Sequence, residues 1–172
     1  MHALGRRRWC REAGSLLLAA AAAPQSFAAE ALGNVPALGA LLRLPDVPLL
    51  EGGEFKAAAT QGQVVVVYWW ASWCPFCAQV TPSIQKLWRT HHDHGLVVLG
   101  LSIDKDLAAA RAYRARRGYD FPSGWVTAAV EAVLPKPTGL PVTVVRGRDG
   151  RVAAAETGQL FPEDVEALAR FL

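Results

Sequence analysis

The chain has 172 residues, of which 52% are hydrophobic, and its formal net charge is +3. Its first 29 residues hold four of the 18 basic residues and one of the 15 acidic ones, so the rest of the chain is neutral overall. That remainder suffices for one domain with a hydrophobic core and is too short for two, and its charge balance gives no indication of binding to nucleic acid or to an anionic surface.

Residues 1–29 have the pattern of a secretory signal. A basic stretch that contains Arg6, Arg7, Arg8 and Arg11 precedes a short, weakly apolar run, and small residues then offer a cleavage site after Ala28 or Ala29. The arginines also fit a twin-arginine signal, so the general secretory and twin-arginine routes both stay open. The apolar run is shorter than the stretch that a membrane-spanning helix needs. We therefore expect an exported protein with a single domain at residues 30–172, no stable membrane span after processing, and Cys10 removed with the signal.

The segment that follows, up to residue 63, contains two short apolar stretches, and the second of them includes Gly52-Gly53. Residues 41–46 and 49–55 are expected to be short strands around a turn at these glycines. The predicted domain therefore begins with a small β-hairpin.

Residues 64–82 read VVVVYWWASWCPFCAQVTP and are the centre of the predicted fold. The unbroken β-branched and aromatic run at 64–70 predicts a strand that is buried on both faces. The helix expected at about 75–92 has its apolar positions on one stripe, at Val80, Ile84, Leu87 and Trp88. Cys74 and Cys77 are therefore expected where a central strand ends and a helix begins, at the carboxyl end of the sheet.

This position favours redox chemistry of the two cysteines. Unpaired amide groups and the dipole of a helix N-terminus stabilise an anion, which lowers the pKa of a thiol such as Cys74. The thiolate of Cys74 would attack the disulfide of a partner, and Cys77 would resolve the mixed disulfide. Pro75 suits the first position of a helix, and Pro75 and Phe76 are expected to influence the reduction potential.

Two other uses of the cysteine pair are less well supported. A zinc site needs four ligands, and no further cysteine remains after processing. A purely structural disulfide at this spacing would constrain the unfolded chain little. We expect no metal at this pair.

The rest of the chain alternates strands and helices. Residues 96–103 predict a second buried strand, and Asp106 is expected to cap a helix at 107–117 that ends at Gly118. Residues 121–134 predict a short strand and a helical turn. Strands at 142–146 and 152–156 flank an Asp149-Gly150 turn, and Pro162 opens a last helix.

Three motifs together give the chain a resemblance to a known family: the segment 70–77, Pro82 within the following helix, and the segment Gly-Leu-Pro-Val-Thr at 139–143. The chain resembles the thioredoxin superfamily, in particular its extracytoplasmic TlpA/ResA-like branch, over roughly residues 35–172. The resemblance implies an α/β fold, a three-layer sandwich in which helices flank a central mixed sheet, with an N-terminal hairpin. It also implies a cis-proline at Pro141 that faces the disulfide, and a partner-binding surface that contains Trp73, Pro75, Phe76, Leu140 and Pro141.

The implied function is that of a periplasmic thiol–disulfide oxidoreductase without a cofactor. Such a protein keeps cysteines of exported partner proteins reduced, for example in cytochrome or copper-site assembly, and is itself reduced by a membrane thiol reductant. A DsbA-like disulfide oxidant stays open as an alternative, as does a periplasmic copper chaperone that would use the cysteines and the histidines at 91–94. A peroxiredoxin is disfavoured, because Ala71 stands where a threonine is expected.

The sequence departs from the family pattern at the proton acceptor for the second cysteine. Tyr68 stands where thioredoxins have a buried carboxylate, and Val80 stands where the TlpA/ResA-like branch has a glutamate. Water or an acid such as Glu51 or Glu54 would have to replace it. The His-His-Asp-His segment at 91–94 is interpreted as the end of a helix, because neighbouring residues of a helix diverge and cannot all bind one ion.

Overall fold

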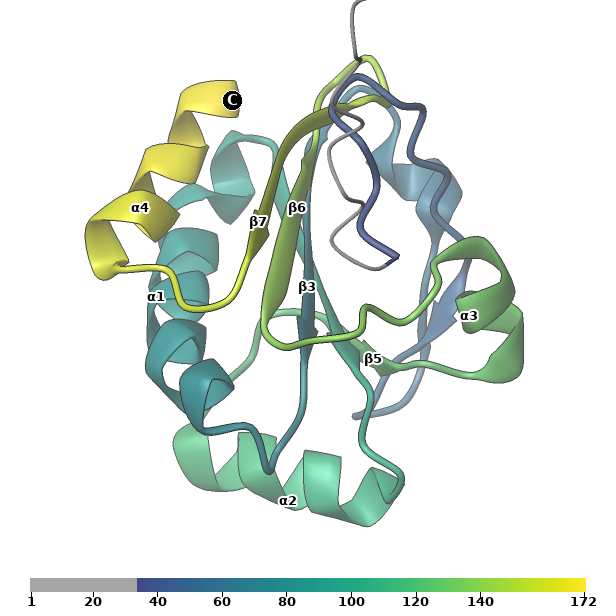
Figure 1. The fold of residues 1–172 in the computed structure, drawn as a ribbon, viewed down its shortest axis with the longest axis vertical. Helices are drawn as coiled ribbons and strands as arrows, with labels where there is room; N and C mark the ends of the chain where they lie inside the picture. The colour runs from purple at the N-terminus through teal and green to yellow at the C-terminus, as the bar shows by residue number, and fades with distance from the viewer. Residues whose placement is uncertain (1–33) are drawn as a thin grey trace, which may run out of the picture.

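The structure is a computed structural model that describes residues 34–172, so the expected signal at residues 1–29 and its cleavage site lie outside the described residues (Figure 1). Within the described range, no helix is both long and apolar enough to span a membrane.

The centre of the fold is a five-stranded mixed sheet. Its strands are β3 (Val64–Trp70), β4 (Leu96–Ser102), β5 (Ser123–Trp125), β6 (Val142–Arg146) and β7 (Val152–Thr157). They lie in the order β5-β4-β3-β6-β7, with β3, β4 and β5 parallel, β6 antiparallel to β3, and β7 antiparallel to β6. The mixed sheet that the sequence predicts is confirmed.

Helices cover the sheet on both sides and complete three layers (Figure 1). Helices α1 (Pro75–His91) and α4 (Pro162–Glu166) lie on one face, while α3 (Ala128–Val133) and the N-terminal segment lie on the other. Helix α2 (Leu107–Arg117) packs its Ala110 and Tyr113 into the same core cluster as α1. The predicted three-layer sandwich is therefore confirmed.

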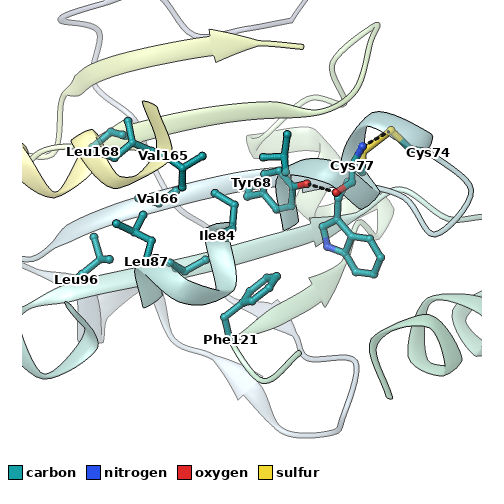
Figure 2. Packing of buried hydrophobic residues seen from close by; sticks show 14 of the residues in the cluster. Val66, Tyr68, Cys74, Cys77, Ile84, Leu87, Leu96, Phe121, Val165 and Leu168 are labelled. Atoms are coloured by element: carbon teal, nitrogen blue, oxygen red, sulfur yellow. Dashed lines mark hydrogen bonds between the residues drawn. A yellow bond between two sulfur atoms is a disulfide. The ribbon is translucent and has the colours of Figure 1, made fainter. Parts of the chain in front are cut away.

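Strand β3 contributes to both halves of the core, because successive side chains of a strand point to opposite faces. Val66 and Tyr68 pack on one face with Ile84 and Leu87 of α1 (Figure 2), and the alternate residues, such as Trp69, pack on the other. All seven residues of β3 are buried, as the unbroken apolar run predicts.

The N-terminal hairpin is present but shorter than predicted. Strands β1 (Val47–Pro48) and β2 (Glu54–Phe55) pair in antiparallel fashion on either side of Gly52 and Gly53. The strand expected at 41–46 is wrong: Leu41 forms only an isolated bridge to Arg151, and backbone hydrogen bonds tie Gly39 and Leu42 to the β6–β7 hairpin. A 3₁₀ helix at Ala57–Thr60 then leads into β3.

Most of the predicted helix boundaries hold. The carboxylate of Asp106 caps α2 by accepting the N–H of Ala108 at 2.8 Å, and α2 ends at Gly118 in the left-handed conformation. The last helix differs from the prediction, because α4 is followed by a 3₁₀ helix at Ala167–Phe171 and the segment is not one continuous α-helix. Val165 and Leu168 still bury their side chains against α1, as the apolar pattern predicts (Figure 2).

Candidate active site

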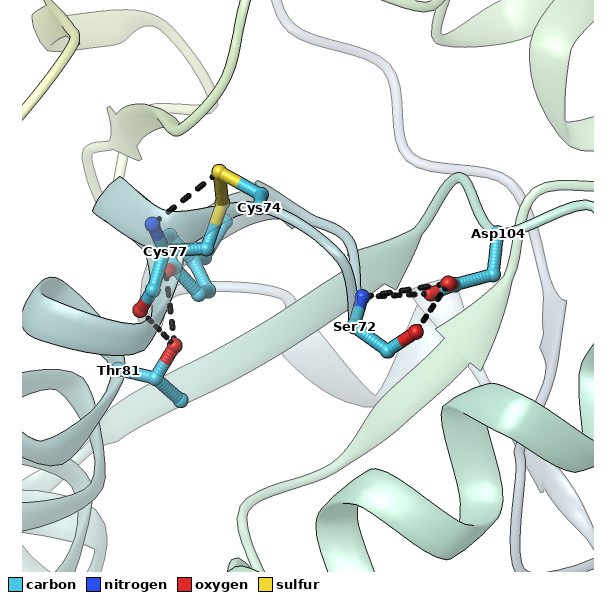
Figure 3. Close-up of a disulfide and its surroundings, with 6 residues drawn as sticks. Ser72, Cys74, Cys77, Thr81 and Asp104 are labelled. Atoms are coloured by element: carbon cyan, nitrogen blue, oxygen red, sulfur yellow. Dashed lines mark hydrogen bonds between the residues drawn. A yellow bond between two sulfur atoms is a disulfide. The ribbon is translucent and has the colours of Figure 1, made fainter.

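Cys74 and Cys77 lie where β3 leads into α1. The backbone N–H of Cys74 donates to the carbonyl of Ala71 at 3.2 Å and closes a turn that delivers Cys74 to the N-cap position of the helix. The two cysteines form a disulfide, with their Cα atoms 5.2 Å apart. The N–H of Cys77 points at Cys74 Sγ across 3.1 Å (Figure 3). The first turn of α1 thus offers an unpaired amide group to this sulfur, which is the arrangement that stabilises a thiolate.

The residues around the two sulfurs are apolar and differ widely in their exposure to solvent. Cys77 is fully buried and Cys74 is 4% exposed, whereas the neighbouring Trp73 and Phe76 are 65% and 51% exposed. Two large apolar rings therefore face solvent near Cys74 in the sequence. Pro75, which the sequence places at the first helical position, occupies it and is exposed.

Leu140 and Pro141 lie at the same end of the sheet. Val142 of β6 pairs with Trp69 of β3, so the register places the two preceding residues beside the point where the chain leaves β3 toward Cys74. The Leu140–Pro141 peptide bond is cis, and the Pro141 carbonyl accepts the N–H of Gly158 at 2.8 Å. Pro141 is buried and Leu140 is partly buried. Leu140 also lines a shallow, mostly apolar cavity of about 360 Å³.

Hydroxyl groups occupy the place of the expected acid behind Cys77. Thr81 donates its hydroxyl to the Cys77 carbonyl at 2.6 Å, and the hydroxyl groups of Tyr68 and Thr81 lie 2.9 Å apart. Burial raises the pKa of Tyr68, so the side chain stays neutral. Val80 is fully buried in the apolar core.

The two glutamates that the sequence offers as substitute acids are engaged elsewhere. Glu51 accepts from the Arg114 guanidinium at 2.7 Å, and Glu54 pairs with Lys56. Both belong to the N-terminal hairpin segment and neither makes a described contact with Cys77. The predicted replacement of the acid by Glu51 or Glu54 therefore gains no support.

One buried carboxylate near the site was not assigned a role from the sequence. Asp104 follows β4 and accepts hydrogen bonds from the backbone N–H of Ser72 at 3.2 and 3.0 Å and from the Ser72 hydroxyl at 2.6 Å (Figure 3). The available signal was an acid just after a buried strand and a serine two residues before the first cysteine. The contact joins residues 32 positions apart, which spacing alone does not reveal.

The histidines at the other end of α1 do not form a site. His91 contacts Glu166 at 3.3 Å, while the ring of His92 stacks on Trp88 with centroids 4.8 Å apart. Among residues 34–172, no three His, Cys, Asp or Glu side chains are arranged to hold a metal ion. The geometry gives the copper-chaperone alternative no support.

Comparison with known proteins agrees with this fold. Residues 42–155 match the sequence profile of the AhpC/TSA family. The chain is 26% identical over 126 residues to the thiol-disulfide oxidoreductase ResA of Geobacillus kaustophilus, and the alignment covers 71% of each protein.

Two crystal structures share the fold. A thioredoxin family thiol:disulfide interchange protein from Chlorobium tepidum superposes with a TM-score of 0.72 at 20% identity, covering 78% of this chain and 97% of that one. A secreted disulfide oxidoreductase of Mycobacterium tuberculosis, described as homologous to DsbE of E. coli, superposes with a TM-score of 0.66 at 21% identity, covering 76% and 97%.

Proposed function

This chain belongs to the AhpC/TSA family and has the fold of thioredoxin-like oxidoreductases, and from that premise we propose that it is a periplasmic thiol–disulfide oxidoreductase of the ResA type. It reduces disulfides in exported partner proteins through Cys74 and Cys77. The observation that carries this proposal is the position of Cys74 at the N-terminus of α1. Its sulfur lies against the N–H of Cys77 and forms a disulfide with the Cys77 sulfur.

The exchange proceeds in two steps. In the reduced protein, the Cys74 thiolate attacks one sulfur of the partner's disulfide, and the other sulfur of the partner leaves as a thiolate. The Cys77 thiol then loses its proton, and its sulfur attacks Cys74 Sγ and displaces the second sulfur of the partner. The partner gains two electrons and, after protonation from solvent, two thiols, while the protein retains the Cys74–Cys77 disulfide.

The exposure of the two cysteines supports this order. Cys77 is fully buried, so a partner reaches Cys74 first, at the edge between the exposed rings of Trp73 and Phe76. These two rings, with Pro75, Leu140 and Pro141, are the proposed contact surface for the polypeptide around the partner's disulfide. Aromatic side chains are frequent anchors of protein interfaces.

The proton of Cys77 goes to water in this scheme. Tyr68 and Thr81 lie next to the Cys77 carbonyl, but burial raises the pKa of Tyr68 and keeps its phenol protonated, so it does not accept the proton. The rate of the second step is therefore expected to rise with pH as the Cys77 thiol ionises.

Reduction, rather than oxidation, of the partner is the proposed direction. The relatives compared above are a ResA protein and structures described as an interchange protein and a homologue of DsbE. Only α2, with 11 residues, lies between β4 and β5, and the large helical domain expected of a DsbA-like oxidant is not found in the part of the chain that the structure describes.

The equilibrium of the purified protein with glutathione tests the direction. A reduction potential below about −230 mV fits a reductant, whereas a value near −120 mV would fit an oxidant and contradict the proposed direction. A wild-type protein that exchanges disulfides no faster than a simple dithiol would contradict the oxidoreductase function itself.

Export belongs to the proposal and rests on the signal-like sequence of residues 1–29. Cytochrome or copper-site proteins as partners and a membrane thiol reductant as electron donor follow from the resemblance to the TlpA/ResA-like branch. Fractionation of cells that express the full chain would test the location: the proposal requires the processed protein in the periplasm, and retention in the cytoplasm would contradict it.

A further inference from the structure

We propose that Asp104 is a positioning residue of the exchange reaction: it holds the turn that places Cys74 at the N-terminus of α1. This inference rests on the proposed function and adds to it a residue outside the cysteine motif. Asp104 acts on the reaction only through Ser72 and the turn.

Asp104 is an unusual side chain for its place. It is 4% exposed and is the only buried carboxylate among residues 34–172, and no described cation pairs with it. Burial of a carboxylate without a cation is unfavourable unless hydrogen bonds replace its hydration. Four such bonds reach the Asp104 carboxylate, from the Ser72 N–H to both oxygens, from the Ser72 hydroxyl and from the Ser102 hydroxyl.

These bonds extend the contact between two strands beyond the end of the sheet. The pairing of β3 with β4 ends at Trp70 and Ser102, and the N–H of Ile103 still reaches the Trp70 carbonyl at 3.0 Å. After that point the carboxylate of Asp104 accepts the next N–H of the β3 side, that of Ser72. The chain is thus held to the sheet for two residues after the strand has ended.

The held residue lies inside the turn that ends at Cys74. This turn runs from Ala71 to Cys74 and is closed by the Cys74 N–H and the Ala71 carbonyl, with Ser72 at its second position. Holding Ser72 therefore restrains the backbone that places Cys74 at the N-cap of α1, where its Sγ lies 3.1 Å from the Cys77 N–H. Misplacement of a reacting atom by about 1 Å is enough to slow a reaction up to ~10²-fold.

Asp104 is itself held in place by hydrogen bonds to the sheet. The Ser102 hydroxyl donates to the carboxylate at 2.7 Å, and the Asp104 carbonyl accepts the indole N–H of Trp125 at 2.7 Å. Ser102 ends β4 and Trp125 ends β5, so the carboxylate of Asp104 is bonded to the end of β4 and its backbone carbonyl to the end of the neighbouring parallel strand. The turn is held by a rigid part of the sheet and not by another loop.

The test compares Asp104→Ala with Asp106→Ala. Asp106 is a matched control: it lies two residues further on, loses the same charge and also accepts a backbone N–H, but that N–H belongs to α2 and not to the turn. We measure the rate of exchange with glutathione disulfide and the pH at which the Cys74 thiol ionises, by thiolate absorbance of the reduced protein. Both readouts are taken on protein shown by circular dichroism to be folded.

Asp104→Ala is expected to slow exchange about tenfold and to move the ionisation of Cys74 to higher pH, while Asp106→Ala changes neither. A folded Asp104→Ala protein with the wild-type rate and ionisation would overturn the inference. Ionisation at lower pH would also overturn it, because it would mean that Asp104 acts as a nearby charge.

Ser72→Ala gives a second test that does not depend on Asp104→Ala being able to fold. Ser72 is partly exposed, and its replacement removes the hydroxyl bond while the backbone N–H remains. We expect a smaller change of both readouts in the same direction, and no change would contradict the positioning role. The ionisation of Cys74 is measured without a partner, so it tests Asp104 even if the wild-type protein failed to exchange disulfides and the proposed function were wrong.

Discussion

The two ends of helix α1 both carry a cluster of reactive side chains, yet only one end is organised as a site. At the N-terminal end, Cys74 and Cys77 lie three positions apart and meet in a disulfide. At the C-terminal end, His91 turns to Glu166 and His92 lies on Trp88, so their rings go to different partners.

The difference follows from helix geometry. Residues three positions apart share one side of a helix, whereas adjacent residues point about 100° apart and cannot converge on one ligand. The N-terminal end also offers free N–H groups to an anion, and one of them reaches Cys74 Sγ at 3.1 Å. The other end presents carbonyl groups, and the Trp88 carbonyl is within 3.1 Å of the His92 ring. A cluster of reactive residues on a helix forms a site when two conditions are met together. The residues must be spaced so that their side chains meet, and free backbone groups must stabilise the atom that reacts.

The largest expected effect on the exchange rate comes from removal of the Cys74 sulfur at the N-terminus of α1. Cys74→Ser should abolish disulfide exchange, because a serine hydroxyl at this position neither ionises near neutral pH nor forms a mixed disulfide. The rate of reduction of glutathione disulfide by the reduced protein measures the effect. Circular dichroism is the control for folding, and residual exchange by a folded variant at more than a few per cent of the wild-type rate would disprove the attacking role.

Replacement of the buried sulfur should stop the reaction halfway. Cys77→Ser should accumulate a covalent complex between Cys74 and the partner, because the first step needs only Cys74. Non-reducing electrophoresis followed by mass spectrometry would detect the complex and identify the partner. The double variant Cys74→Ser/Cys77→Ser is the control, and normal turnover by Cys77→Ser would show that another group resolves the intermediate.

The exposed ring of Trp73 should affect the rate of exchange with protein disulfides but not with small disulfides. Trp73→Ala is expected to lower the rate with a protein disulfide about tenfold, equivalent to about 1.4 kcal/mol, and to leave the rate with glutathione disulfide unchanged. Because Trp73 is largely exposed, its loss should not lower the free energy of unfolding. Equal slowing with both substrates would show that Trp73 acts on the cysteine chemistry rather than on docking.

The hydroxyl pair behind Cys77 should affect stability more than exchange. Tyr68→Phe removes the hydroxyl that lies 2.9 Å from Thr81 and should lower the free energy of unfolding by about 1 kcal/mol. Since burial raises the pKa of Tyr68, the folded state keeps it neutral while an unfolded tyrosine ionises above pH ~10, so wild-type stability should fall above that pH.

Urea unfolding of both proteins between pH 7 and 11 measures this difference. Tyr68→Phe should lose stability less steeply above pH ~10 than the wild type, because the phenylalanine has no ionisation to suppress. A slowing of exchange by tenfold or more in this variant would place Tyr68 in the proton route of Cys77, contrary to our account.

The smallest effect is expected at the histidine end of α1. Replacement of His91, His92 and His94 by alanine should leave the exchange rate unchanged, since none of them contacts the cysteines. The partly exposed contact of His91 with Glu166 should contribute no more than about 1 kcal/mol to stability. Loss of exchange in the folded triple variant would mean that the two ends of α1 are coupled.

The sequence predicts those parts of the molecule whose structure is decided locally. The unbroken apolar run of β3, the apolar stripe of α1 and the cap at Asp106 appear where their patterns place them. Cys74 and Cys77 are readable for the same reason, because a helix N-terminus and a spacing of three residues are local features.

The features that the sequence does not reveal depend on distant partners. The apolar pattern around Leu41 suggests a strand that does not form, because the backbone there is bonded to the distant β6–β7 hairpin. The bond between Ser72 and Asp104 depends on the register of β3 against β4, which no short motif encodes. Likewise, Trp70 and Trp73 are the same residue type, but Trp70 ends β3 and is buried, whereas Trp73 lies in the turn after the strand and is exposed.

The most direct test of the account is titration of the reduced protein while thiolate absorbance is followed. The Cys77→Ser variant assigns the signal to Cys74. The account predicts that Cys74 ionises at clearly lower pH than the ~8.5 of an ordinary thiol, because the first turn of α1 holds its sulfur as an anion. Ionisation of Cys74 at or above that value would contradict the account.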